Sequence, residues 1–130
     1  MSKLIRNSNQ VKQAIDFSGI GDDKIHPTDI DAVLEFDNKA LILFEAKKVG
    51  NNLPTGQRLL LERLVDSWHT EKSIAIIVKH DFKDDTIDIP LAECWVTNYY
   101  YDSKWYKCKK PLKPYLQNIL DKWNITKLSL

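Results

Sequence analysis

The sequence is poor in the residues that mark several specialised classes of protein. Its 130 residues include four glycines, five prolines and two cysteines, while 43% are hydrophobic. This composition excludes a collagen-like or disordered chain, because enough apolar surface is present to offset the entropy lost on folding. The two cysteines, Cys94 and Cys108, are not a closely spaced pair. Neither a zinc site nor a disulfide scaffold is therefore expected.

The sequence also lacks an excess of one charge and any long apolar run. Nineteen Lys and Arg against eighteen Asp and Glu give a net charge of +1, which excludes polybasic proteins that coat nucleic acid or membranes without specificity. No apolar stretch approaches the roughly 20 residues of a membrane-spanning helix, and the N-terminal residues lack the apolar core of a signal peptide. With no repeat or linker, we expect residues 1–130 to form a single domain in the cytoplasm, without a membrane partner.

Hydrophobic patterns predict an α/β (α+β) domain in which helices flank a mixed β-sheet. The elements follow the order α-ββ-α-β-ββ-α, with helices over residues 8–17, 55–68 and 111–123 and β-prone segments over residues 29–36, 40–49, 73–79, 91–96 and 98–107, the last containing a turn at residues 102–103. The first two strands form a hairpin through a tight turn at residues 37–39. The apolar strand at 73–79 is expected to be central and parallel to the strand before it, through the connecting helix.

The helix expected over residues 55–68 has two faces. Its apolar stripe should pack on the sheet, and Thr55 is a suitable N-cap. Arg58, Glu62 and Asp66 recur at every fourth position. We expect these three on the face away from the sheet.

Four charged residues interrupt the apolar strands of the predicted hairpin: Asp29 and Asp31 in the first strand, Glu45 and Lys47 in the second. Residues two apart in a strand share a face. If the turn occupies residues 37–39, Asp31 lies opposite Glu45 and Asp29 opposite Lys47. Three carboxylates and one amine should then converge on one face.

This grouping is typical of a divalent cation site. Adjacent carboxylates on a buried face cost several kcal/mol unless a cation compensates them. Oxygen ligands from Asp31 and Glu45, with the backbone carbonyl of Ala46 and water, suit Mg²⁺ or Mn²⁺. Such an ion binds a phosphate oxygen and lowers the pKa of its water, and Lys47 can orient that water or stabilise charge on phosphorus. Phosphodiester hydrolysis uses a metal ion, its bound water and a cationic side chain in this way.

A purely structural explanation of the same charges is also open. The two aspartates can be solvent-facing residues of a half-exposed strand, and Glu45 and Lys47 can be a surface ion pair. The pattern Asp/Glu-x-Lys occurs five times in the chain, four of them in expected loops or turns. Only Glu45-Ala46-Lys47 follows an apolar run in a predicted strand with an acid opposite, which favours the functional site.

Three motifs lie in order along about half of the chain, from Phe17 to His80: Pro27-Thr28-Asp29-Ile30-Asp31, Glu45-Ala46-Lys47 and Gly56-Gln57. Together they resemble the PD-(D/E)XK nuclease superfamily, which has a restriction-endonuclease-like fold, and in particular its small phage-encoded members. The resemblance implies that Asp31 and Glu45 bind the metal and that Lys47 is the catalytic lysine, with Asp29 as an auxiliary residue. It also implies a host-cytoplasmic protein if a phage encodes the chain. Many members carry a further glutamate in the first helix, where this sequence offers only Asp16.

Gln57 is a candidate on independent grounds. It lies four residues before Leu61 and seven before Leu64, on the sheet-facing stripe of a helix that starts near the end of the Glu45 strand. We expect it to point into the site, although a glutamine at a helix start can also be an ordinary polar residue. In some branches of the superfamily a glutamine here contacts the metal-bound water or the DNA backbone.

The C-terminal ribbon interleaves aromatic residues with lysines and has no acid between Ser103 and Leu120. Aromatic rings stack on bases and lysines contact phosphates. The ribbon is therefore a candidate nucleic-acid-binding surface through Lys104, Trp105, Lys107, Lys109 and Lys110. An ordinary half-exposed strand shows the same alternation, so both interpretations stay open.

The sequence thus predicts a Mg²⁺- or Mn²⁺-dependent nuclease, with DNA favoured over RNA as the substrate. Asp31 and Glu45 would bind the metal, Lys47 would lie beside the nucleophile, and Gln57 would assist. The alternative is a catalytically silent nucleic-acid-binding or phage–host interaction module on the same fold, which uses the lysine-rich ribbon. A single domain of this size that cuts two strands would most simply act as a symmetric homodimer.

Overall fold

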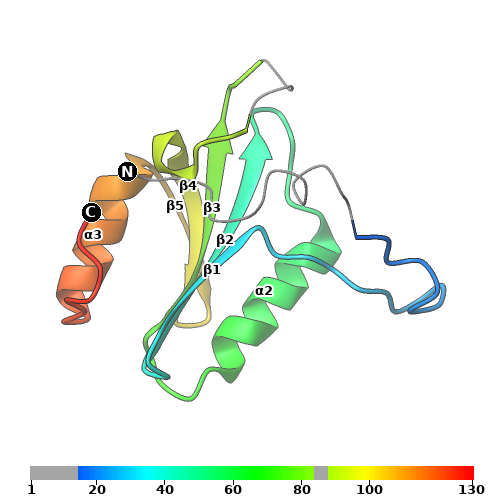
Figure 1. Ribbon diagram of the computed structural model, residues 1–130, viewed down its shortest axis with the longest axis horizontal. Coiled ribbons are helices and arrows are strands. Elements are labelled where there is room, and N and C mark those ends of the chain that lie inside the picture. The colour runs from blue at the N-terminus through cyan, green and yellow to red at the C-terminus, as the bar shows by residue number, and fades with distance from the viewer. Residues whose placement is uncertain (1–14, 84–87) are drawn as a thin grey trace.

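Five strands form one mixed sheet in which each strand lies beside its neighbour in the chain, in the order β1-β2-β3-β4-β5. The computed structural model describes residues 15–83 and 88–130. The strands are β1 (Ala32–Phe36), β2 (Ala40–Lys48), β3 (Ser73–His80), β4 (Trp95–Tyr101) and β5 (Lys104–Pro111). The described helices are α2 (Thr55–Ser67), α3 (Leu112–Lys122) and the short 3₁₀ helix η1 (Leu91–Glu93) (Figure 1). The predicted combination of helices with a mixed sheet is confirmed.

β1 and β2 form the antiparallel hairpin predicted from the sequence. Phe36 faces Ala40, so the predicted register is confirmed. In the turn, Asp37 and Asn38 have φ angles of 51° and 64°. A type I′ turn requires this left-handed conformation, and Asp and Asn adopt it more readily than most residues.

α2 connects β2 to β3, and these two strands run parallel, as predicted. β3 is the middle strand of the five. Its residues from Ser73 to Val78 are all buried. The apolar, β-branched character of this strand follows from its central place, because both of its faces are covered.

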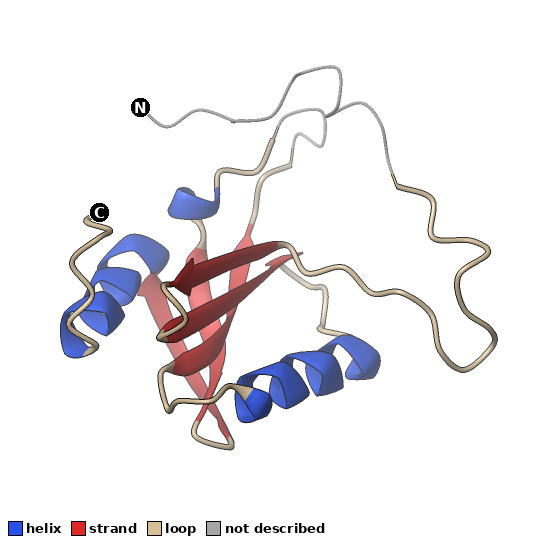
Figure 2. Ribbon diagram, turned by 60° about the horizontal axis from the view of Figure 1, so that its bottom comes forward, coloured by secondary structure: helices blue, strands red, loops and turns tan. Residues whose placement is uncertain are grey.

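The two α-helices cover opposite faces of the sheet (Figure 2). Ile42 of β2 packs in a core that includes Leu116 of α3, whereas Leu43 packs in a second core with Leu61 of α2. Side chains alternate along a strand, so the odd-numbered residues of β2 face α2. The acid and the lysine near the end of β2 have odd numbers and lie on this α2 face.

β4 contains a bulge at Thr97. The register with β3 and the register with β5 both shift beside this residue. Val96 and Tyr99 pack with the core under α3, whereas Tyr100 packs with the core under α2. A regular strand would place Val96 and Tyr100 on the same face. The extra residue reverses the alternation, so that Asn98 and Tyr100 face α2.

The order of elements differs from the predicted order. The helix expected over residues 8–17 lies almost entirely outside the described residues, and residues 15–17 have no regular structure. The first part of the strand expected over residues 91–96 is the 3₁₀ helix η1. The Glu93 N–H donates to the Pro90 carbonyl over 3.0 Å, and the fixed φ of proline favours such a turn over a strand.

Two element starts also differ from the prediction. β1 begins at Ala32, so Asp29 and Asp31 precede the strand; the Asp31 N–H bonds a side chain in place of a backbone partner. At α2 the N-cap is Pro54, and no side-chain cap bond forms. Thr55 is therefore the first helical residue and not the cap.

The polar stripe of α2 contacts strands β4 and β5, which corrects the prediction that it lies on the face away from the sheet. Trp105 Nε1 donates to Glu62 Oε2 over 2.6 Å, and the Tyr100 hydroxyl donates to Asp66 Oδ2 over 2.9 Å. Arg58 also bonds Glu62 at 2.6 Å. The stripe is in fact the polar contact between α2 and the β4–β5 hairpin, whose aromatic donors need acceptors when they are partly buried.

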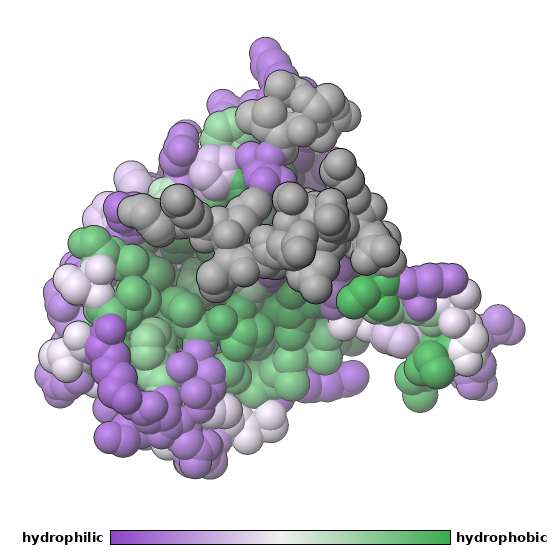
Figure 3. All heavy atoms as spheres, viewed as in Figure 1, coloured by the Kyte–Doolittle hydropathy of each residue, from purple (hydrophilic) through white to green (hydrophobic). Residues whose placement is uncertain are grey.

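Apolar residues gather in the middle of the face seen in Figure 3, between α3 and α2. Val33 of β1 is 50% exposed, because β1 is an edge strand with one neighbour. Within the part of the chain that the structure describes, no helix has the length and apolar character needed to cross a membrane.

Candidate active site

Two hydrogen bonds hold Asp31 beside Glu45 and Ala46. The Asp31 N–H donates to Glu45 Oε1 over 3.1 Å, and the Ala46 N–H donates to Asp31 Oδ2 over 2.7 Å. These bonds follow directly after the last backbone pair of the hairpin, Ala32 with Phe44. The hairpin therefore brings the two acids together, one at the start of β1 and one near the end of β2.

Glu45 lies on the α2 face and is only 2% exposed. Burial and then the charge of Asp31 raise the pKa of the Glu45 carboxyl, while the Asp31 N–H and the Lys47 ammonium act in the opposite direction. The net shift is upward. The groups around Glu45 thus compensate its negative charge incompletely, which is the electrostatic condition that a bound cation would relieve.

Lys47 and Gln57 complete the group. Lys47 Nζ lies 3.6 Å from Glu45 Oε2 and donates to Gln57 Oε1 over 2.9 Å. Gln57 lies in the first turn of α2, and its side chain points to the end of β2. The amide and the carboxylate hold the lysine ammonium between the sheet and the helix.

The two carboxylates could hold one divalent cation. Asp31 Oδ1 and Glu45 Oε2 take no part in the two backbone hydrogen bonds. The Ala46 carbonyl lies on the same side of β2 as its N–H, because both groups of a strand residue point to the same neighbouring strand. These oxygens fit Mg²⁺, which binds through one or two carboxylates together with waters and substrate phosphates. Across residues 15–83 and 88–130, no group of three acidic, histidine or cysteine side chains forms a larger metal site.

Asp29 does not join this group by contact, which corrects the expected pairing with Lys47. Asp29 is exposed and lies ahead of β1, where the strand ladder has already ended. Lys47 instead contacts Gln57. The charge of Asp29 makes only the last-ranked contribution to the raised pKa of Glu45.

The lysines of β5 and its tryptophan have different environments. The exposed lysines are Lys104, Lys107, Lys109 and Lys110. Trp105 is partly buried on the α2 face, with its ring centroid 5.2 Å from that of Tyr100 and its N–H bonded to Glu62. The lysines are open to phosphate groups, whereas the tryptophan forms a wall beside α2.

Sequence reasoning missed two cations near this group. Arg58 follows Gln57 directly in α2, and Lys79 of β3 is the register partner of Lys47. A signal for Lys79 existed in the sequence: it is the polar residue at the end of the apolar run 73–79, and aligning that run with the preceding strand places the two lysines side by side.

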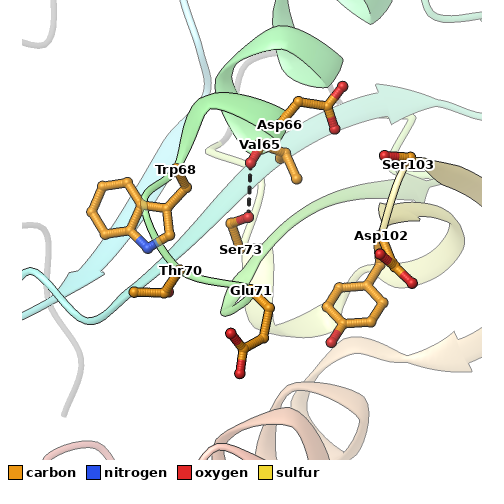
Figure 4. Close-up of a pocket in the computed structure, with 9 residues that line it drawn as sticks. Val65, Asp66, Trp68, Thr70, Glu71, Ser73, Asp102 and Ser103 are labelled. Carbon is orange, nitrogen blue, oxygen red and sulfur yellow. Dashed lines mark hydrogen bonds between the residues drawn. The ribbon is translucent and has the colours of Figure 1, made fainter.

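A separate cavity of about 370 Å³ lies at the other end of α2 (Figure 4). Its lining includes the carboxylates of Asp66, Glu71 and Asp102. Ser73 also lines it, and the Ser73 hydroxyl donates to the Val65 carbonyl over 2.9 Å. Three carboxylates would repel phosphate groups, so this cavity is not a candidate for binding nucleic acid.

Comparison with known protein families, curated proteins and solved structures finds no match to the chain. Function is therefore inferred from the chemistry of the site. That chemistry is a pair of carboxylates, an ammonium and a carboxamide at the carboxyl end of a parallel strand pair, where α/β sheets commonly bind ligands.

Proposed function

We propose that the protein is a metal-dependent nuclease that hydrolyses phosphodiester bonds in DNA, on a restriction-endonuclease-like core similar to that of the PD-(D/E)XK superfamily. One observation carries the proposal: the buried Glu45 carboxylate lies against Asp31, with the Lys47 ammonium 3.6 Å away. A buried carboxylate beside a second acid reduces stability, and such costs concentrate at functional sites.

The residues have distinct tasks in this proposal. Asp31, Glu45 and the Ala46 carbonyl would hold Mg²⁺ or Mn²⁺ at the end of β2. When bound, the ion would act as a Lewis acid on a phosphate oxygen and lower the pKa of a bound water. The protein would supply the fixed geometry, since the Asp31 and Glu45 carboxylates are oriented by backbone N–H groups.

Lys47 would stabilise the negative charge that develops on the phosphate during hydrolysis. Its ammonium has three protons; Gln57 accepts one, Glu45 attracts a second, and a third can reach the substrate. Gln57 is a positioning residue for this lysine. The uncapped first turn of α2 also presents backbone N–H groups, which favour phosphate binding.

A second candidate is a nucleic-acid-binding module without catalysis. The exposed lysines of β5 favour it, because they could bind phosphates without any metal. The two functions differ in whether Glu45 and Lys47 are needed for the effect on DNA.

The test is incubation of supercoiled, linear and branched DNA with the protein in Mg²⁺ or Mn²⁺. We expect cutting by the wild type and a loss of at least about 100-fold in Glu45→Gln and Lys47→Ala, the usual size for removing an electrostatic catalytic group. The matched controls Glu71→Gln and Lys122→Ala change exposed residues outside the site and should cut like the wild type.

Equal cutting by the wild type, Glu45→Gln and Lys47→Ala would contradict the proposal. The absence of cutting together with metal-independent DNA binding would favour the silent module. Cutting that EDTA abolishes and Mg²⁺ restores, only when Glu45 and Lys47 are present, would support the nuclease.

A further inference from the structure

A second cavity, of about 250 Å³, directly adjoins the candidate active site. Six of the residues that line it are Leu53, Arg58, Ile77, Lys79, Asn98 and Trp105. Ile77 is the register partner of Glu45 and Lys79 that of Lys47, while Arg58 follows Gln57 in α2. The cavity therefore lies one strand away from the proposed catalytic residues, on the same face of the sheet.

One wall of this cavity is a fixed aromatic ring. The Trp105 N–H bonds Glu62 at 2.6 Å, and the ring packs against that of Tyr100 with 5.2 Å between centroids. Leu53 and Ile77 add apolar surface. Because the ring is held in place before any ligand arrives, stacking on it would cost little conformational entropy.

The remaining lining is polar, and only one of its two cations is paired with an acid. Asn98 and Asn52 contribute carboxamides, each with a donor and an acceptor side. The Arg58 guanidinium already bonds Glu62, and Lys79 Nζ donates to the Asn51 carbonyl. The carboxamides and the face of Trp105 therefore suit a flat ring with hydrogen-bonding edges.

We infer that this cavity binds one unpaired nucleobase beside the phosphodiester bond that the active site cleaves, an assignment that rests on the proposed nuclease function. A base that stacks on Trp105 and bonds the Asn98 carboxamide has to leave its own stack, because neither its faces nor its pairing edge is free within a duplex. The volume lies below the roughly 300–1,000 Å³ of pockets for drug-sized ligands, which suits a single base. The substrate class is therefore DNA with an unpaired or single-stranded nucleotide next to the cut.

The test compares binding of two labelled DNAs by fluorescence anisotropy in EDTA, so that no cutting occurs. One is a perfect duplex, and the other is the same duplex with one unpaired nucleotide. We expect the second to bind about tenfold more tightly, which is in the range for stacking of one base on an aromatic ring. Asn98→Ala and Trp105→Phe should reduce this ratio, and Asn118→Ala on α3 should leave it unchanged.

Equal affinity of the wild type for the two DNAs would overturn the assignment, as would a preference that survives in Asn98→Ala. Trp105→Phe keeps an aromatic ring in the core, and thermal unfolding of each variant checks that it is folded. Cleavage in Mg²⁺ separates this inference from the proposed function. A preference lost in Asn98→Ala without any cleavage would count against the nuclease alone, whereas cleavage with equal affinity for both DNAs would count against the cavity alone.

Discussion

Glu45 shows how a single carboxyl group links stability to pH. Its pKa is raised in the folded protein, first by burial and then by Asp31. The folded state therefore favours protonated Glu45. The stability that this provides is complete below the ordinary glutamate pKa and is lost as the pH rises through the raised value. Above the raised pKa and without a cation, the ionised Glu45 weakens the fold.

The first prediction concerns Glu45→Gln in EDTA. At neutral pH this change should increase the free energy of unfolding by about 1 kcal/mol, a typical size for a single substitution, because the repulsion from Asp31 is removed. The gain should shrink as the pH falls into the range where glutamate is protonated. Urea denaturation at neutral pH and at the pH where glutamate is protonated measures the gain and its decrease. Glu71→Gln is the control. A loss of stability that is equal at both pH values would contradict this prediction.

The second prediction concerns the divalent cation. Mg²⁺ at 100 times its dissociation constant should add about 2.7 kcal/mol to the stability of the wild type. Asp31→Asn and Glu45→Gln should show little of this gain, since each removes a carboxylate ligand. Asp102→Asn in the exposed β4–β5 turn is the control and should respond like the wild type. Similar stabilisation of all four proteins would exclude the proposed site.

At the scale of elements, the sequence predicted what depends on local chemistry. The Asp37-Asn38 turn and the alternation on either side of it were sufficient to place Asp31 beside Glu45. The extent of β1 was not predictable in this way, because the strand ladder ends where the Asp31 N–H turns to the Glu45 side chain. That choice depends on a residue far along the chain.

The polar stripe of α2 illustrates the limit of helical periodicity. Charges at every fourth position indicate a face away from the apolar core, and the three charged residues indeed lie outside both hydrophobic cores. Their partners, however, are Tyr100 and Trp105, which follow Asp66 and Glu62 by 34 and 43 residues. No local sequence pattern predicts such a contact, because it depends on the angle at which the helix packs on the sheet.

The third prediction tests this contact. Tyr100→Phe removes the hydroxyl that donates to Asp66 and should cost about 1 kcal/mol of stability, the net value of one hydrogen bond. Tyr106→Phe is a matched control on β5, where the tyrosine is 37% exposed and its ring stacks on Tyr99. Denaturant midpoints of the two variants should differ. Equal stability of both variants would show that the Tyr100 bond contributes nothing.

At the scale of the whole molecule, the sheet separates two faces that both carry lysines. The net charge of +1 is an average over both. Lys107 is the register partner of Asn98 and so lies on the α2 face with the candidate active site, whereas Lys122 ends α3 on the other side of the sheet. On the proposed function, we expect lysines on the α2 face to contact the bound DNA.

The fourth prediction follows from this separation. Lys107→Ala should weaken DNA binding similarly for all sequences and reduce the slope of log affinity against log salt by about 1, the effect of one lost phosphate contact. Lys122→Ala should change neither quantity. The measurement is a salt titration of anisotropy with each variant. The same slope for Lys107→Ala and the wild type would remove β5 from the DNA-binding surface.

The bulge at Thr97 determines which side chains of β4 lie on the α2 face. Along a strand, side chains alternate with a period of two, and one additional residue shifts the phase by half a period. Deleting Thr97 would leave Asn98 and Tyr100 on the α2 face, because Asn98 would then follow Val96 in regular alternation. Inserting one regular strand residue beside Thr97 would instead turn both side chains to the opposite face. The cavity would lose its carboxamide and Asp66 its hydroxyl donor in a single event. An inserted residue in β4 would therefore remove two contacts of the α2 face at once, an effect that no single substitution can reproduce.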